Sequence, residues 1–376
     1  MNKIEKLINK LCPDGVEYKT IIQLCDINRG RTISKDYLRK NPGNYPVYSS
    51  QTENNGIFGY INSYDYDLES ITWTTDGAKA GSVFYHNNEK FSITNICGLL
   101  KITNKDLIPK FLYYILKITA KSYVSPGMGN PKLMSNVMEQ IPIPIPPISI
   151  QKKIVKILDK FTELETELET ELEKELKLRK KQYEYYRNQL LTPVEINSKW
   201  YLNSKEVELK ELEQSGVNIF SGKNKKRDDK GKYNVYGSTG IIGKTNNYIY
   251  DKEQILIARV GSAGFVNIAK GKYDVSDNTL IVQIINENEI KFKFLYYLLI
   301  FLKLNQFAKG AAQPLITASQ IKKLKIPVPP ISEQNRIAII LDKFTELEIE
   351  LEKELKLRKK QYEYYREKLL TFKKKK

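Results

Sequence analysis

The chain has 376 residues, enough for two domains that each bury their own core, and 61 Lys and Arg against 44 Asp and Glu give it a net charge of +17. This excess favours a polyanionic partner, with nucleic acid ahead of an anionic membrane surface, although a lysine-rich surface without such a partner is the alternative. No apolar run reaches the roughly 18 residues of a membrane span, and the N-terminus is too polar for a secretory signal. Three cysteines without metal-ligand spacing complete the prediction of a reduced, cytoplasmic protein.

The first half predicts a mixed domain followed by a long helix. After a short polar helix, residues 45–67 and 71–85 combine β-branched and aromatic residues with glycine and asparagine, a pattern typical of short strands and tight turns. Residues 110–117 are apolar on most sides and predict a core helix. The proline cluster at 142–147 ends this domain, because proline neither continues a helix nor donates to a sheet. A long helix follows, and Pro193 stops it.

The second half repeats this order of elements. Strand-like stretches recur at 233–251 and 255–268, a core helix at 293–300 and a proline cluster at 327–330. A second long helix then runs to about Leu370. The fold class predicted is therefore α/β (α+β), with two similar globular domains in tandem that are each followed by a long helix.

One segment is repeated letter for letter. KELKLRKKQYEYYR occurs at 174–187 and again at 353–366, about 180 residues later, which indicates a duplicated chain rather than a solenoid of short repeats. Such a chain can hold a pseudo-twofold axis by itself. It therefore suits a partner with twofold character, of which duplex DNA is the commonest.

The long helices carry apolar residues at spacings that favour a partner helix. In the first helix leucines recur every four residues, and in the second the spacings are three, four and seven. The predicted seam positions are Leu164, Leu168, Leu172 and Leu176, and Phe344, Leu347, Leu351, Leu355, Tyr362, Tyr365 and Leu369.

Charge predicts the direction in which the two helices pair. Residues 162–173 carry six glutamates and no base, whereas residues 174–187 carry six bases and two glutamates. An antiparallel coiled coil sets acidic beside basic segments, and a parallel one does not. Solvation of both faces is the alternative, since exposed ion pairs contribute only about 0–1 kcal/mol each. The motif TELE occurs three times in the first helix, whereas the second has TELE and IELE, so the first is longer by four residues, or about 6 Å.

Two matching segments of the sequence carry a resemblance to a known family. The segments PKLMSNVMEQIPIPIPPISIQKKI at 131–154 and PLITASQIKKLKIPVPPISEQNRI at 314–337 lead into the long helices with their KKQYEYYR ending. In this combination and at this spacing the chain resembles, over essentially its whole length, the specificity subunit of type I restriction–modification systems.

The resemblance implies a function and a division of the chain. Two target-recognition domains, at 1–148 and 193–331, would each read one half of a split sequence in double-stranded DNA. The helices, at 149–192 and 332–376 with a basic tail, would form the antiparallel coiled coil that sets the spacer. The subunit would have no activity alone; it would recruit two methyltransferase subunits and, with motor-nuclease subunits, form the restriction complex.

No catalytic site is predicted in this chain. His86 is the only histidine, which excludes a histidine-based relay or metal centre, and its setting in a predicted turn indicates a polar surface residue. No phosphate-binding GxxxxGK[ST] loop and no convincing dinucleotide motif occur. Asp14 and Glu17 superficially resemble a nuclease pattern but are too close together to share a metal from two strands. We therefore predict no metal and no cofactor.

The DNA-contacting candidates are basic and amide side chains near glycines, because Arg pairs with guanine, Asn or Gln with adenine, and Lys with phosphate. In the first domain they are Arg29, Arg31, Lys35, Thr75, Lys79, Asn130 and Lys132. In the second domain they are Lys223, Lys225, Lys226, Arg227, Arg259 and Gln313. Arg259 and Gln313 match Thr75 and Asn130 in position, and loops that correspond but differ in side chain are what two different half-sites require. A solvated surface loop is the alternative for any single lysine.

The ends of the helices offer a second surface. Tyr beside Arg is a common interface composition, so Tyr185, Arg187, Tyr364 and Arg366 are candidate methyltransferase contacts in light of the resemblance. Packing of each helix end against a globular domain is the alternative for these residues.

Three other functions stay open from the sequence. One is a basic coiled-coil scaffold with paired lectin-like or peptide-binding domains. Another is an orphan DNA-binding protein that acts as a repressor or recombination partner without modification enzymes. An enzyme with a divergent site is the third, and the missing histidines and motifs weigh against it.

Overall fold

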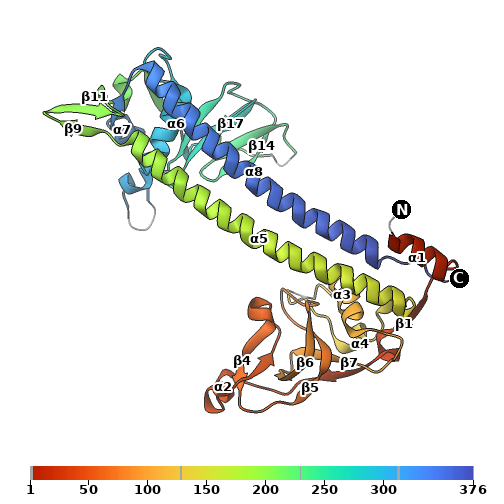
Figure 1. Cartoon of the computed structure of the whole chain (residues 1–376). Helices are drawn as coiled ribbons and strands as arrows, with labels where there is room; N and C mark the ends of the chain where they lie inside the picture. Colours follow the sequence, from red (N-terminus) through yellow and green to blue (C-terminus); the bar gives the residue numbers. More distant parts are fainter. Residues whose placement is uncertain (1–2, 128, 229, 311–313, 376) are drawn as a thin grey trace. The chain divides into compact units, whose positions relative to one another are not determined.

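The computed structural model describes residues 3–127, 129–228, 230–310 and 314–375, which fall into two compact units. The first unit comprises Met1–Thr170 and Leu355–Lys376, and the second comprises Glu171–Glu354 (Figure 1). The division runs through the two helix segments predicted at 149–192 and 332–376, whereas the domains predicted at 1–148 and 193–331 each lie within one unit. Each unit instead combines one globular domain with the beginning of one long helix and the end of the other.

The first globular domain is a curved sheet with helices packed on it. Its helices and strands are α1 (Lys3–Leu11), β1 (Glu17–Thr20), β2 (Cys25–Arg29), α2 (Lys35–Lys40), β3 (Tyr45–Tyr48), β4 (Ile57–Ile61), β5 (Tyr66–Thr74), β6 (Val83–Ile93), β7 (Cys97–Ile102), α3 (Pro109–Thr119), α4 (Ser135–Met138) and β8 (Pro142–Ile145). Six strands form one sheet in the order β2-β7-β5-β6-β3-β4, and β1 pairs with β8. The elements predicted from β-branched runs and from the apolar helix are confirmed.

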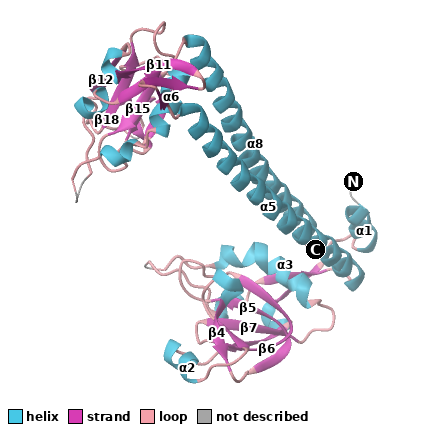
Figure 2. Ribbon diagram, turned by 60° about the vertical axis from the view of Figure 1, so that its left-hand side comes forward, coloured by secondary structure: helices cyan, strands magenta, loops and turns pink. Residues whose placement is uncertain are grey.

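The core of this domain lies between its sheet and α3 (Figure 2). Trp73 of β5 is fully buried, and its indole nitrogen donates to the Leu133 carbonyl over 2.9 Å. A side chain at Gly98 of the neighbouring strand would lie within 2.4 Å of this indole, so only glycine fits beside it. Phe111 of α3 joins the same apolar cluster. The tryptophan thereby ties the sheet to the loop that follows α3.

The second globular domain repeats the central strand order of the first. Its helices and strands are β9 (Val194–Ile196), β10 (Lys199–Leu202), β11 (Lys205–Glu211), β12 (Val217–Ser221), β13 (Tyr233–Gly237), β14 (Gly240–Thr245), β15 (Gln254–Ala258), β16 (Val266–Ala269), β17 (Tyr273–Val275), β18 (Thr279–Ile284), α6 (Phe292–Phe301), α7 (Ala318–Lys322) and β19 (Lys325–Val328). The sheets run β12-β18-β15-β16, β14-β13-β17 and β19-β11-β10-β9. The first of these orders corresponds to β2-β7-β5-β6, which confirms the duplication.

Two hairpins before β12 were not predicted from the sequence. β9, β10 and β11 are joined at Asn197-Ser198 and at Asn203-Ser204, and all four turn residues have positive φ. Positive φ at both central residues is required by the mirror-image (type I′) turn, whose twist matches that of the two strands of a hairpin. The repeated Asn-Ser pair was the available signal, and it is weaker than the usual Asn-Gly.

The two long helices, α5 (Ile148–Leu191) and α8 (Ile331–Leu370), pair in opposite directions. In the first unit the Thr162 hydroxyl lies 2.9 Å from the Tyr362 hydroxyl, and Glu169 pairs with Lys359 over 3.3 Å. In the second unit the Tyr186 ring stacks on Phe344. There Lys180 also pairs with Glu352 over 3.5 Å. Positions that advance along α5 meet positions that recede along α8, so the predicted antiparallel coiled coil and its acidic–basic pairing are confirmed.

Three residues of the predicted seam are exposed: Leu164 at 49%, Leu347 at 40% and Tyr365 at 41%. Beside the two leucines, Glu165 and Glu348 are partly buried. Burial raises the pKa of both glutamates. A repeat of four residues advances about 400° per step, so it drifts around the helix and turns glutamate toward the partner.

The segment after α8 belongs to the first globular domain. The Val16 amide donates to the Lys373 carbonyl over 2.8 Å, and the Lys375 amide donates back to the Val16 carbonyl over 2.9 Å. The Tyr18 hydroxyl donates to the Phe372 carbonyl, and the Phe372 ring is buried in the core cluster of this domain. The stretch interpreted from the sequence as a basic tail therefore completes a core near the other end of the chain.

Candidate nucleic-acid interface

Four loops of the first domain are joined by backbone hydrogen bonds. The Thr75 amide donates to the Ile96 carbonyl over 3.3 Å, and the Leu133 amide donates to the Thr75 carbonyl over 2.9 Å. Arg31 forms an isolated β-bridge with Thr94. We call this group the first loop cluster, consisting of residues 29–31, 75–79, 94–96 and 130–133.

The second domain builds the same arrangement from different residues. The Arg259 amide donates to the Asn278 carbonyl, and the Ile316 amide donates to the Arg259 carbonyl, both over 2.9 Å. Asn224 forms an isolated β-bridge with Ser276. The second loop cluster consists of residues 222–227, 259, 276–278 and 315–316. The shared backbone pattern confirms that Arg259 takes the place of Thr75.

The structure brings both candidate arginines of the first domain into the first loop cluster. Arg29 is exposed, and its guanidinium donates to the Asn95 carbonyl over 2.8 Å. Arg31 is exposed, pairs with Asp65 over 3.0 Å and stacks on the Tyr37 ring, and these contacts raise its pKa. Each guanidinium is thus held in one orientation while part of it faces solvent, as base or phosphate recognition requires.

A second group in the same cluster centres on Asp76. The Asn130 amide donates to Asp76 over 3.2 Å, and the Lys132 ammonium lies 3.9 Å from the same carboxylate. Both candidates are therefore oriented by an acidic residue that the sequence analysis passed over. The TTDGAK turn was the signal for it, because Asp in a Gly-containing turn commonly accepts from neighbouring loops.

Thr75 is placed differently from the expectation. It is only 1% exposed, and its hydroxyl donates to the Ile96 carbonyl over 2.8 Å. Thr75 therefore holds the loop together, and its side chain is not presented to a ligand. Lys79 belongs to the cluster and Lys35 lies near it in sequence, and both are exposed. The prediction for Thr75 is wrong because this residue follows the central strand β5, and the turn that crosses the end of the strand buries its short side chain.

Arg259 of the second loop cluster is held by two acceptors. Its Nη1 donates to the Ser221 hydroxyl over 3.2 Å and to the Asp277 carbonyl over 3.0 Å. Its Nε is buried without a hydrogen-bond partner. The guanidinium is therefore oriented from one side and half-buried. Asn278, which occupies the place of Ile96, was not singled out from the sequence.

The basic side chains of the lysine-rich loop of the second domain are exposed. Lys223, Lys225, Lys226 and Arg227 all face solvent. The three lysines line a cavity of about 430 Å³ with Ile249, Tyr250 and Asp274. Gln313 lies outside the described residues. The cavity gives this loop a concave, basic surface of the kind that follows a phosphate backbone.

The helix-end candidates divide into tyrosines and arginines. Tyr185 and Tyr364 are 63% and 59% exposed. Arg187 is buried over the Tyr183 ring, and Arg366 packs over the Tyr362 ring in the same way. Each arginine thus packs on a tyrosine one turn earlier in its own helix, whereas Tyr185 and Tyr364 are exposed.

His86 is not a surface residue. It lies in β6, is 3% exposed, and its ring nitrogens are 2.8 Å from the Thr72 hydroxyl and 3.0 Å from Glu89. These partners account for both nitrogens within the core. Among the described residues there is no group of three or more His, Cys, Asp or Glu side chains that could hold a metal ion. In the same part of the chain no helix is long and apolar enough to cross a membrane.

The duplicated domains, the two matched loop clusters and the antiparallel helices define a protein of two similar domains, each attached to a long helix. The sequence profile of the type I restriction modification DNA specificity domain matches residues 13–178 and again 201–358. The chain therefore belongs to the family of type I restriction–modification specificity subunits. It is a recognition subunit and not an enzyme, and its role is sequence-specific DNA recognition within such a system.

Two relatives agree with this assignment. A type I specificity subunit of Mycoplasma pneumoniae is 34% identical over 94% of this chain and 96% of its own length. The specificity subunit of the type I restriction enzyme MpnII, from the same organism, is 43% identical over 51% of this chain and 58% of its own length.

Two solved structures share the fold. The specificity subunit from M. genitalium superposes with a TM-score of 0.56 at 20% identity, covering 95% of this chain and 96% of that one. A chain from a study of complex assembly in the type I system gives 0.65 at 13% identity, covering 95% of this chain and 96% of its own.

Proposed function

We propose that the chain reads a bipartite target in double-stranded DNA, with one half-site for each loop cluster. The observation that carries the proposal is the shared backbone frame with different side chains. Thr75 of the first cluster is replaced by Arg259 in the second, and Arg31 is replaced by Asn224. Equivalent frames position the two clusters alike, and different side chains give each its own base preference.

The basic side chains of the two loop clusters are of the types that bind bases and phosphates of DNA. Arg29, Arg31 and Arg259 offer oriented guanidinium groups that can form the bidentate pair with guanine. The lysine-rich loop at 223–227 supplies phosphate contacts, which add affinity without sequence preference. The net charge of +17 acts in the same direction.

The helices are proposed to set the spacer between the half-sites. Antiparallel pairing within each unit supports this role, because it holds the end of one helix against the beginning of the other. Four extra residues in the TELE stretch amount to about 6 Å, or one to two base pairs at about 3.4 Å each. Spacer length would then follow helix length.

The proposed partners are two methyltransferase subunits and, where a restriction complex forms, motor-nuclease subunits. One methyltransferase per half of the duplicated chain would match its pseudo-twofold symmetry. The exposed Tyr185 and Tyr364, at equivalent places on the two helices, are proposed as part of the docking surface. The proposed site of action is the cytoplasm.

The test is a map of modified bases in native DNA from the source cell with and without this gene. Loss of methylation at one split motif with a fixed gap would support the proposal and reveal both half-sites. An unchanged map would count against it and favour an orphan DNA-binding role. A scaffold would bind DNA without any preference between duplexes of different sequence.

A further inference from the structure

Each globular domain is attached to the beginning of its adjoining long helix by a buried glutamine. Gln151 is 0% exposed; its Oε1 accepts from the Ile108 amide over 2.9 Å, and its Nε2 donates to the Asp106 and Pro146 carbonyls. In the second unit Gln334 is also 0% exposed and makes the same three bonds, with Lys291, Glu289 and Pro329. Both glutamines join a helix to the loop before the core helix of its domain.

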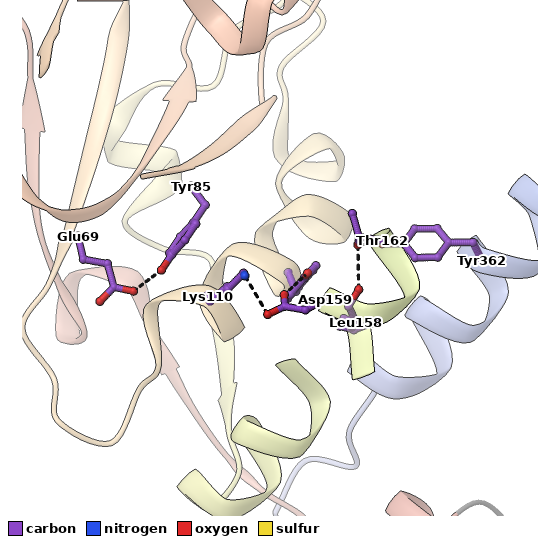
Figure 3. A network of polar contacts seen from close by, with 8 residues as sticks. Glu69, Tyr85, Lys110, Leu158, Asp159, Thr162 and Tyr362 are labelled. Carbon is purple, nitrogen blue, oxygen red and sulfur yellow. Dashed lines mark hydrogen bonds and ion pairs between the residues drawn. The ribbon is translucent and has the colours of Figure 1, made fainter. Parts of the chain in front are cut away.

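A carboxylate about two turns further along each helix makes a second attachment. Asp159 accepts from the Tyr114 hydroxyl over 2.6 Å and from the Lys110 ammonium over 2.8 Å, both from α3 (Figure 3). In the second unit Asp342 accepts from the Tyr297 hydroxyl over 2.6 Å and from the Lys293 ammonium over 2.9 Å, both from α6. We call each set of glutamine, aspartate, tyrosine and lysine a clamp.

The clamps restrict the rotation of each domain on its helix more tightly than apolar packing does. Ile154 and Leu158 of α5 pack against the core of the first domain, and such contacts tolerate small rotations because the hydrophobic effect is not directional. The Gln151 amide has three partners in fixed directions, and a buried amide that loses them stays unsatisfied. A rotation of the domain on its helix therefore breaks bonds that water cannot replace.

The two halves share the clamps although they differ in the loop clusters. Gln, Asp, Tyr and Lys recur at equivalent places in both halves, whereas Thr75 and Arg259 are different side chains in one frame. Both halves thus attach the domain to its helix in the same way, whereas each loop cluster has its own proposed base preference.

We propose that Gln151, Asp159, Gln334 and Asp342 are positioning residues for spacer recognition. By fixing the angle of each domain on its own helix, they make the protein reject DNA in which correct half-sites are separated by one base pair more or fewer. This inference rests on the proposed bipartite reading. It adds that spacer stringency depends on the joint between domain and helix, in addition to the length of the helices.

The experiment uses the full chain and DNA duplexes that carry its two half-sites with the native spacer or a spacer altered by one base pair. The clamp variants are Asp159→Ala and, as a milder change, Tyr114→Phe. The matched control is Tyr48→Phe, which removes the hydroxyl of a buried tyrosine that donates to Glu89 inside the same domain. In the second unit Tyr297→Phe is compared with Tyr273→Phe, whose hydroxyl is bonded to Gln254 within that domain.

The clamp variants are expected to reduce the affinity penalty for an altered spacer by up to roughly tenfold, since each 1.4 kcal/mol of lost restraint is a factor of ten. Sequence preference within each half-site should not change, and the control variants should keep the wild-type spacer profile. A merely structural role would lower the melting temperature of clamp and control variants alike and leave the ratio of affinities unchanged.

An unchanged spacer profile in Asp159→Ala and Tyr114→Phe would overturn the inference while the bipartite function stands. A wild-type chain that shows no preference for any pair of half-sites would overturn the proposed function itself. If Asp159→Ala does not fold, Tyr114→Phe decides, because it removes a single hydroxyl and keeps the ring in the core.

Discussion

The hydroxyl of Thr162 in α5 lies 2.9 Å from the hydroxyl of Tyr362 in α8, across 200 residues of sequence. Thr162 also donates to the Leu158 carbonyl one turn earlier in its own helix. The pair lies beside the clamp of the first unit, as Figure 3 shows. The joint between domain and helix is therefore continuous with the seam between the helices, and a change of helix register alters both.

Deletion of Thr166–Glu169 should shorten the preferred DNA spacer. The deletion removes about 6 Å of helix and returns α5 to the repeat number of α8, so the half-site sequences should stay the same while the gap shrinks by one or two base pairs. A map of methylated motifs in cells that carry the variant measures the gap. An altered half-site would contradict the spacer role of the helices.

Replacement of Arg259 by alanine should affect only the half-site of the second domain. Loss of a bidentate contact with a base costs about 1–3 kcal/mol and relaxes specificity at that position. Binding to duplexes mutated in one half-site at a time measures this effect. Lys225→Ala is the control, because an exposed phosphate contact should weaken binding to all duplexes alike and reduce its salt dependence. Equal weakening of both half-sites by Arg259→Ala would show a role in folding or phosphate binding.

Glu348→Gln should stabilise the protein at neutral pH. Burial raises the pKa of Glu348, and its Oε1 has no hydrogen-bond partner. The folded state therefore binds the proton more tightly than the unfolded state, so this residue favours folding below its unfolded pKa of about 4.5 and opposes it as the pH rises through the folded pKa.

The melting temperature of Glu348→Gln at pH 7 should rise by about 1–2 °C, and the difference from the wild type should vanish below about pH 4.5. Thermal melts across this pH range measure it. Glu350→Gln, at an exposed position of the same helix, should have no effect at either pH. A stabilisation that is the same at pH 4 and pH 7 would exclude the burial of charge as its cause.

Phe372→Ala should destabilise the first globular domain and leave the second unchanged. The ring is buried, lies 6.2 Å from the Phe111 ring between centroids and fills the core below α3, so its removal should cost up to about 3 kcal/mol. Hydrogen exchange resolved by domain measures the change. Phe265→Ala removes an exposed ring and serves as the control. Equal loss of protection in both domains would contradict the assignment of this residue to the first core.

Much of the architecture follows from local sequence patterns. The duplication, the strand-rich domains, the core helices at 110–117 and 293–300 and the antiparallel pairing are read from repeats, apolar periodicity and segregated charge, because these act between near neighbours or along one helix. The Asn-Ser hairpins and the exposure of Leu164 were not predicted, because turn type and helix face depend on small angles that accumulate along the chain.

The placement of individual side chains was decided by tertiary structure. Sequence alone presented Thr75 and His86 as surface residues, and the fold buries both because loops from other parts of the chain cross them. The clamps depend on residues about 45 positions apart, such as Tyr114 and Asp159, and no local pattern announces such a pair. What the sequence determined by itself was that the chain consists of two similar halves with unlike loops and an excess of basic residues. Which candidate side chains are exposed and which are buried was decided only by the packing of distant segments, since burial and hydrogen-bond direction are properties of the assembled chain.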